Sequence, residues 1–226
     1  MTFLFLDAGH GGIDSGAVAL DGTKEKDVNL KMTMYMFNRF NQIGIKTGVT
    51  RSKDITLNSN DRTRIVRNSG AKYCLSIHFN AGGGDGFEAI HSKFASSKLA
   101  DSIADEVKAI GQNVRRVFTR TLSNGKDYYF MNRETGNVET VILEGFFGDN
   151  LKDYEDFNEW HEQVDLCEAY IKGFCNHVKH KYTPPTKEEV FYRVVTGSFS
   201  NIENAEKRSD ELKKKGFDSF IDIYKK

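Results

Sequence analysis

Four side chains that can bind a metal ion or move a proton lie at the ends of apolar segments. His10 belongs to LDAGHGG (residues 6–12), which follows the first apolar run, while His78 and Glu144 close the runs CLSIH and TVILE. Glu25 opens an amphipathic segment just after the glycine-rich loop that holds His10. Imidazole nitrogens and carboxylate oxygens both suit zinc. These residues therefore predict either a metal site or an acid–base centre.

A histidine between glycines fits two kinds of site, a phosphate cradle or a metal centre. The glycines of AGHGGIDSG do not match G-x-G-x-x-G, no Lys-Ser/Thr pair follows, and no helix begins directly after them. Two histidines and one carboxylate would leave a fourth zinc position open for water, whose pKa falls to about 7 on the metal. A further carboxylate can then act as base and acid. The metal interpretation is favoured.

Hydrophobic patterning predicts the elements that position these residues. Strands are expected at TFLFLD (2–7), IKTGVTR (45–51), KYCLSIHFN (72–80), GFEAIH (86–91) and ETVILEG (139–145), with helices at 25–40, 59–70, 96–111 and 160–178. Alternating strands and helices indicate an α/β domain with a mainly parallel, twisted sheet and helices on both faces. Sites in such sheets form at the carboxyl ends of the strands, where the candidate residues stand.

Composition narrows the class of protein. The chain has 226 residues, enough for one sizeable domain and a small one, and 38% are hydrophobic. Its 32 basic and 32 acidic residues cancel, so charge gives no case for a nucleic-acid or membrane partner. Cys74, Cys167 and Cys175 lie in apolar contexts and are expected to be buried and free. The N-terminal run lacks a basic region and is broken by Asp7, which predicts a buried strand rather than a signal peptide.

Both prolines of the chain lie in KYTPPTKEEV, and we expect residues 181–190 to form a linker. It separates a domain over 1–180 from a tail over 191–226. The tail pattern predicts a small βαβ unit, in which Ser200 or Asn201 caps a helix that ends at Gly216.

Four segments together resemble the signature blocks of zinc-dependent N-acetylmuramoyl-L-alanine amidases, the type-3 amidase family. They are LDAGHGGIDSGAVALDGTKEKDVNL, TRSKDITLNSNDRT, CLSIHFNA and VILEGFFGDN, and the resemblance covers residues 2–180. It implies that His10, Glu25 and His78 bind one zinc ion and that Glu144 is the catalytic acid/base. It also implies that Asn80 lies near the site.

The implied activity is hydrolysis of the peptidoglycan amide bond between the lactyl group of N-acetylmuramic acid and L-alanine. The zinc ion would polarise the carbonyl and activate water, and Glu144 would take the water proton and return it to the leaving nitrogen. Phe146 stands where the family usually has glycine, and we expect it to reshape the rim of the cleft and alter stem-peptide preference. Two alternatives are a zinc peptidase of the stem peptide and a wall-binding protein without activity.

Several of these residues have a plainer interpretation. His10 could instead hydrogen-bond to Asp7, and Glu25 could be only a carboxylate in the first turn of a helix, a position that the helix dipole favours. Arg51 and Arg62 match family positions and could either brace carboxylates or contact substrate. The remaining histidines are expected on the solvated surface; they are His91, His161, His177 and His180.

The segment VVTGSFSNIENAEKRSDELKKKGF (residues 194–217) resembles about half of a SPOR domain, a peptidoglycan-binding module. A unit this small rarely folds alone, so we expect it to dock on the catalytic domain or to form a homodimer. With no export signal expected, the chain would be made in the cytoplasm. It would reach the wall after release, through phage lysis or lysis of a mother cell.

Overall fold

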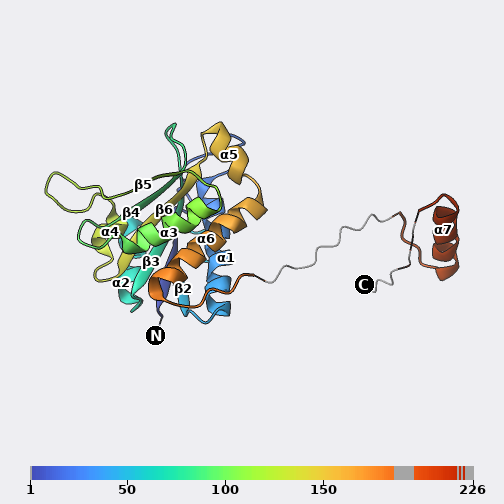
Figure 1. Ribbon diagram of the computed structural model, residues 1–226, viewed down its shortest axis with the longest axis horizontal. Helices are drawn as coiled ribbons and strands as arrows, with labels where there is room; N and C mark the ends of the chain where they lie inside the picture. The colour runs from blue at the N-terminus through green and yellow to red at the C-terminus, as the bar shows by residue number, and fades with distance from the viewer. Residues whose placement is uncertain (1, 186–195, 218, 220, 222–226) are drawn as a thin grey trace. The chain divides into compact units, whose positions relative to one another are not determined.

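The computed structural model describes residues 2–185, 196–217, 219 and 221 (Figure 1). Six strands form one sheet in the order β2-β1-β3-β6-β4-β5. Their bounds are β1 Leu4–Ala8, β2 Thr47–Val49, β3 Tyr73–Asn80, β4 Phe87–His91, β5 Val114–Phe118 and β6 Glu139–Phe147. All neighbouring pairs are parallel except β4 and β6, which are antiparallel. The predicted α/β fold with a mainly parallel sheet is confirmed.

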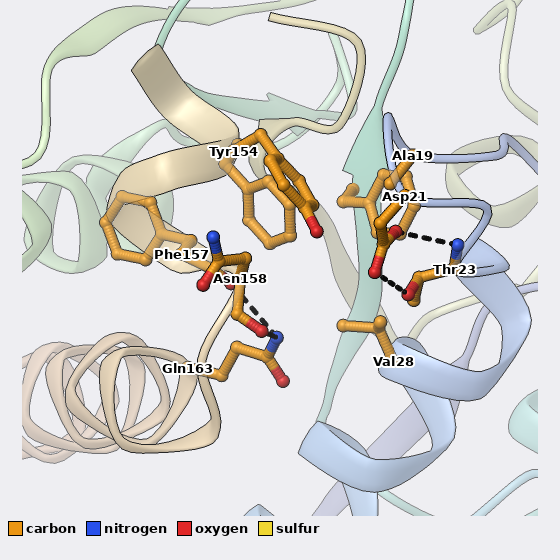
Figure 2. A pocket seen from close by; sticks show the side chains of 10 residues that line it. Ala19, Asp21, Thr23, Val28, Tyr154, Phe157, Asn158 and Gln163 are labelled. Atoms are coloured by element: carbon orange, nitrogen blue, oxygen red, sulfur yellow. Dashed lines mark hydrogen bonds between the residues drawn. The ribbon is translucent and has the colours of Figure 1, made fainter. Parts of the chain in front are cut away.

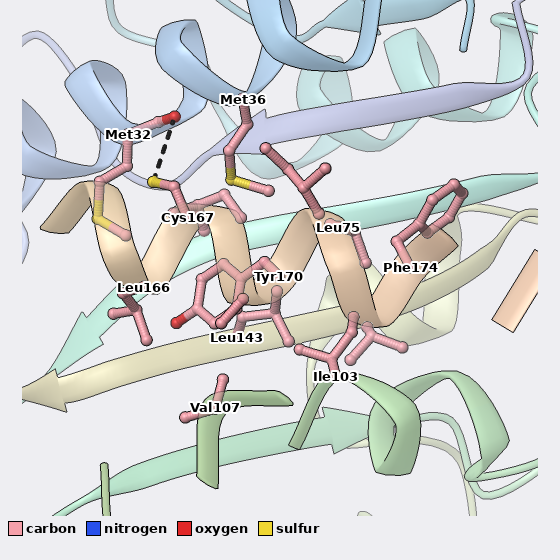
Figure 3. Close-up of a cluster of buried hydrophobic side chains, with 14 of the residues drawn as sticks. Met32, Met36, Leu75, Ile103, Val107, Leu143, Leu166, Cys167, Tyr170 and Phe174 are labelled. Carbon is pink, nitrogen blue, oxygen red and sulfur yellow. Dashed lines mark hydrogen bonds between the residues drawn. The ribbon is translucent and has the colours of Figure 1, made fainter. Parts of the chain in front are cut away.

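Helices cover both faces of this sheet, as expected. Their bounds are α1 Glu25–Gln42, α2 Ser59–Asn68, α3 Lys98–Ala109, α4 Phe130–Glu134, α5 Leu151–Phe157 and α6 Trp160–Val178. The long helices α1, α3 and α6 pack on one face of the sheet and form the larger hydrophobic core with it. There, Tyr170 and Phe174 of α6 lie among side chains of α1, α3, β3 and β6 (Figure 3). The shorter α2 and α4 pack on the opposite face over a smaller core around Val66, Met131 and Ile142.

Alternation along the strands assigns residues to these faces. Leu75 and Ile77 of β3 belong to the larger core, whereas Cys74 belongs to the smaller one. Successive strand residues point to opposite faces, so His78 shares the face of Cys74. Among the described residues, the helices α2 and α4 pack on that face. The three cysteines are buried and free, as predicted.

Three elements of the described chain were missed by the sequence prediction, β5, α4 and α5, and the antiparallel direction of β4 was not predicted. The strand β5 contains two adjacent arginines, which interrupt the apolar alternation expected of a strand. The helices α4 and α5 have only five and seven residues, too few to show a clear helical period. The strand β4 runs against β6, a direction that hydrophobic patterning alone does not specify.

The chain divides into two compact units, Met1–Pro185 and Thr186–Lys226, within the predicted linker. The first residues of that segment are tied to the larger unit. Tyr182 donates a hydrogen bond to Glu168 of α6 (2.8 Å), and Arg39 of α1 donates one to the carbonyl of Thr183 (2.7 Å). The smaller unit contains α7, Ile202–Lys214, whose N-cap is Asn201 as expected. The strands predicted beside it fall largely outside the described residues.

Candidate metal centre

The loop after β1 holds His10 in a backbone conformation that side chains seldom adopt. His10 has φ of 59°, in the left-handed region. Two neighbouring glycines leave room for the histidine rings: a side chain at Gly9 would collide with the ring of His78, and a Cβ at Gly16 would lie 2.6 Å from Cδ2 of His10. These glycines therefore provide clearance, as the metal interpretation expected.

Glu25 is the first residue of α1 and lies between the two imidazoles. Its Oε2 is 3.1 Å from Nε2 of His10, and its Oε1 is 2.8 Å from Nδ1 of His78. The backbone N–H of Ala17 and the side-chain amide of Asn29 also donate hydrogen bonds to this carboxylate. The helix therefore presents a buried carboxylate in a fixed orientation.

The structure brings His10, Glu25 and His78 together although they come from a loop, a helix and a strand. One ligand atom from each lies within 4.8 Å of the others, a grouping that could hold a metal ion. Two nitrogens and one carboxylate oxygen form the donor set of catalytic zinc sites, which keep one position for water or substrate. The residues present fit a zinc ion.

Electrostatics in this cluster are dominated by the single carboxylate. Burial would raise the pKa of Glu25, but hydrogen bonds and charge from the two histidines lower it well below its usual range. Burial would lower the pKa of His78, yet the hydrogen bond and charge of Glu25 raise it to about 9. The pKa of His10 is raised in the same way, against burial.

Glu144 lies on β6, directly opposite His78 of β3 in the parallel ladder. Burial raises its pKa to about 7; the charges of Glu25 and Glu88 act in the same direction, while His78 opposes them. A carboxyl group with a pKa near 7 can both accept and donate a proton at neutral pH. Its position beside the cluster suits an acid/base role.

The buried charge of Asp7 behind the loop has a structural role. Asp7 is fully buried and bonds Arg62 (2.6 Å), Thr50 (2.7 Å) and Ser76 (2.7 Å), not His10. The alternative in which His10 pairs with Asp7 is therefore wrong.

Two arginines hold the loop backbone in place. Arg62 donates to the carbonyl oxygens of Ala8 (2.6 Å) and His10 (2.7 Å). Arg51 donates to the carbonyls of Ala8 and Gly9. Arg62 thus braces a carboxylate, that of Asp7, as one of the two interpretations expected, whereas Arg51 braces backbone carbonyls.

The sequence interpretation missed Asp14. Its Oδ2 lies 2.9 Å from Nδ1 of His10, on the opposite side of the ring from Glu25. A carboxylate bonded to the far nitrogen of a metal-binding histidine fixes the ring orientation and raises its basicity. The only sequence signal was an aspartate four residues after the histidine within the same loop.

Phe146 does not lie on the rim of the cleft, so that expectation is wrong. It is 3% exposed and stacks between Phe79 (ring centroids 5.1 Å apart) and Phe157 (5.7 Å). The three rings line a small pocket between α5 and the start of α1, where Figure 2 labels Tyr154, Phe157 and Val28. The bulky side chain of Phe146 therefore fills part of the larger core beside α5.

The other histidines differ in their surroundings. His161 is exposed, as predicted. His180 is partly buried and its Nε2 lies 2.8 Å from the carbonyl oxygen of Ile43, so the surface prediction is wrong there. His177 packs edge-on against Tyr73. Both contacts anchor the end of α6.

Comparison with known proteins agrees with this geometry. A sequence model described as N-acetylmuramoyl-L-alanine amidase (Amidase_3) matches residues 4–176. The chain belongs to the N-acetylmuramoyl-L-alanine amidase family. It is accordingly a peptidoglycan hydrolase, and the predicted amidase activity is confirmed. A SPOR domain model matches residues 179–226.

Similar proteins include several named amidases. N-acetylmuramoyl-L-alanine amidase CwlM of Bacillus licheniformis is 27% identical over 237 residues, covering 100% of this chain and 86% of its own length. The catalytic domain of CwlV from Bacillus (Paenibacillus) polymyxa has a TM-score of 0.71 and 26% identity, covering 80% of this chain and 100% of that one. An endolysin of Bacillus phage SPP1 is 28% identical over 179 residues, which is 75% of this chain and 64% of the endolysin.

The amidase family is generally zinc-dependent, and the cluster of two histidines and a glutamate is a possible site for that ion. The SPOR match together with the amidase family implies binding to peptidoglycan. In the part of the chain that the structure describes, no helix combines the length and apolar character needed to cross a membrane.

Proposed function

We propose that this amidase holds one zinc ion through His10, Glu25 and His78 and uses Glu144 as its general acid/base. The observation that carries the proposal is the convergence of three ligand atoms within 4.8 Å, beside a carboxyl group on the adjacent strand. Asp14 orients His10, while Ala17 and Asn29 orient Glu25. When bound, zinc supplies a Lewis acid that polarises a carbonyl and acidifies water.

The residues of the chain perform the proton transfers in this proposal. Glu144 accepts a proton from the water that attacks the lactyl carbonyl. It then donates that proton to the nitrogen of L-alanine, so that the C–N bond breaks and a free amine leaves. A pKa near 7 allows both transfers, because the group is neither fully protonated nor a very weak base at neutral pH.

Replacing Glu144 with glutamine tests the acid/base assignment. The variant should keep zinc binding, measured by titration calorimetry, and lose about 10²–10⁴-fold in hydrolysis of purified peptidoglycan. Hydrolysis is followed by the new amino groups of L-alanine, which also separates an amidase from a stem-peptide peptidase. Glu139→Gln, at the opposite end of the same strand, is the matched control and should behave as wild type. A Glu144→Gln enzyme with normal activity would show that another group is the base.

The metal ligands are tested separately. His10→Ala and His78→Ala should each fail to bind zinc stoichiometrically, and chelation of wild type should stop hydrolysis until zinc is restored. Hydrolysis that survives complete chelation would exclude the metal assignment.

We also propose the domain bounds 1–180 and 191–226, with 181–190 as linker and the SPOR-like tail binding peptidoglycan or pairing two chains. The family match to residues 179–226 supports a wall-binding role for the tail. Sedimentation of the full chain tests pairing, and a strictly monomeric protein at high concentration would exclude it.

Action on the wall after lytic release is supported by the similarity to a phage endolysin. Lysis by externally added protein tests whether it acts on intact walls.

A further inference from the structure

A row of charged residues extends from the proposed metal centre toward the edge of the sheet. Glu144 pairs with His78 on one side and with Glu88 of β4 on the other. Glu88 in turn pairs with Arg116 of the edge strand β5. Directly opposite residues in neighbouring strands point to the same face. The row therefore places an arginine two strands away from the proposed acid/base.

A β-bulge brings a second arginine to the same place. Phe87 pairs with Val114 but Glu88 pairs with Arg116, so Arg115 is an extra residue on β5. Adjacent strand residues normally point to opposite faces. Here Nε of Arg116 lies 2.8 Å and Nε of Arg115 lies 3.1 Å from the same oxygen of Glu88. Bulges near active sites commonly redirect a side chain in this way.

The two arginines exceed what the buried carboxylate needs. Glu88 is 3% exposed, and one guanidinium would compensate its charge. Its other oxygen accepts a hydrogen bond from Asn80 (3.2 Å), the residue expected near the substrate. Both arginines are held through Nε, and their terminal nitrogens hydrogen-bond to none of the described residues. The three charged side chains carry one net positive charge.

The guanidinium groups are oriented before any ligand arrives. Arg116 stacks over Phe118 at 4.0 Å from the ring centroid, and Arg115 lies over Phe147 at 5.3 Å. Their side chains are 51% and 43% exposed. A guanidinium fixed at one edge and open at the other matches the geometry of a carboxylate, which it can bind with two parallel hydrogen bonds.

We infer that Arg115 and Arg116 bind a free carboxylate of the stem peptide and thereby set which stems are cleaved fastest. The inference rests on the proposed function, because Glu144 marks the position of the scissile bond. Neighbouring strands are about 4.8 Å apart, so the two guanidiniums lie roughly 5–10 Å from Glu144. Two residues of extended peptide span about 7 Å. The carboxylate bound is therefore the one on the second residue of the stem, a glutamate joined through its side chain.

The test compares two muramyl tripeptides that differ in one group. Both have an amidated C-terminus; the second residue is D-glutamate with a free α-carboxyl in one and D-isoglutamine in the other. Wild type should cleave the acid form with a kcat/KM about 10- to 100-fold above the amide form, the value of a charge-assisted hydrogen-bond pair. Arg115→Gln/Arg116→Gln should bring this ratio close to one. Arg120→Gln, a nearby arginine that lies over Tyr128 instead, is the matched control and should keep the wild-type ratio.

Binding of the same two peptides to the Glu144→Gln variant gives a readout that needs no turnover. The acid form should bind more tightly by a similar factor, and this preference should vanish when both arginines are also replaced. Equal handling of the two peptides by wild type, or an unchanged preference in the double arginine variant, would overturn the inference. Preference for a third peptide, amidated at the second residue but free at its C-terminus, would overturn it as well. Loss of activity on chelation and in Glu144→Gln tests the proposed function independently of these ratios.

Discussion

Replacing Arg62 with methionine should destabilise the catalytic unit strongly, although the residue is not one of the proposed metal ligands. Arg62 is 4% exposed and its Nη1 lies 2.6 Å from Oδ1 of Asp7, which is fully buried. The variant leaves a buried carboxylate without its cation, a change that costs about 3–5 kcal/mol. For a protein of this size each kcal/mol lowers Tm by roughly 2–4 °C, so Tm should fall by roughly 6–20 °C.

The consequence should reach the metal centre as well. Arg62 also donates a hydrogen bond to the carbonyl of His10, which holds that residue in its left-handed conformation. We expect zinc to bind more weakly to the folded Arg62→Met protein, as measured by titration calorimetry below its Tm. The loop then has fewer restraints on the histidine that must face the ion.

The matched control lies two residues along the same helix. Arg64 pairs with Asp61 on the surface, with side chains 61% and 39% exposed, and exposed pairs contribute at most about 1 kcal/mol. Arg64→Met should therefore shift Tm only slightly in thermal unfolding followed by circular dichroism. Adding Asp7→Asn to Arg62→Met should recover part of the loss, because the unpaired charge is removed. Equal Tm values for wild type and Arg62→Met would refute the reasoning.

Three further outcomes are expected. Asp14→Ala should weaken zinc binding about 10- to 100-fold in calorimetric titration, because His10 loses the carboxylate that orients it; an unchanged affinity would contradict this role. Zinc affinity should fall as the pH decreases below 9, by about tenfold per pH unit for each proton that zinc displaces. The reason is that the pKa of His78 is raised to about 9, whereas zinc binds the neutral ring. A zinc affinity that does not change between pH 6 and 9 would argue against this. Phe146→Ala should lower unfolding stability by about 3–5 kcal/mol in urea denaturation without altering the ratio of rates on acidic and amidated stems; a changed ratio with intact stability would restore a role at the cleft.

The sequence by itself was enough to predict the fold class and to select the residues of the proposed centre. Apolar runs predicted the buried strands, and the alternation of strands with helices predicted a mainly parallel sheet. His10, His78 and Glu144 were identifiable because polar side chains at strand ends meet at one edge of a parallel sheet. Such patterns are local, and each can be recognised within a few residues.

Tertiary structure alone decided which partners these residues have. Asp7 bonds side chains that lie 43, 55 and 69 residues away, and no local pattern specifies those pairs. Phe146 was expected to reshape the rim of the cleft because it stands where the family usually has glycine, yet stacking against Phe79 and Phe157 buries it.

The arginine pair shows the same limit most clearly. A single extra residue in β5 turns Arg115 toward Glu88, and that register depends on how two strands align. Hydrogen-bond register and burial are properties of packed neighbours distant in sequence, which is why residue types could be predicted and their contacts could not.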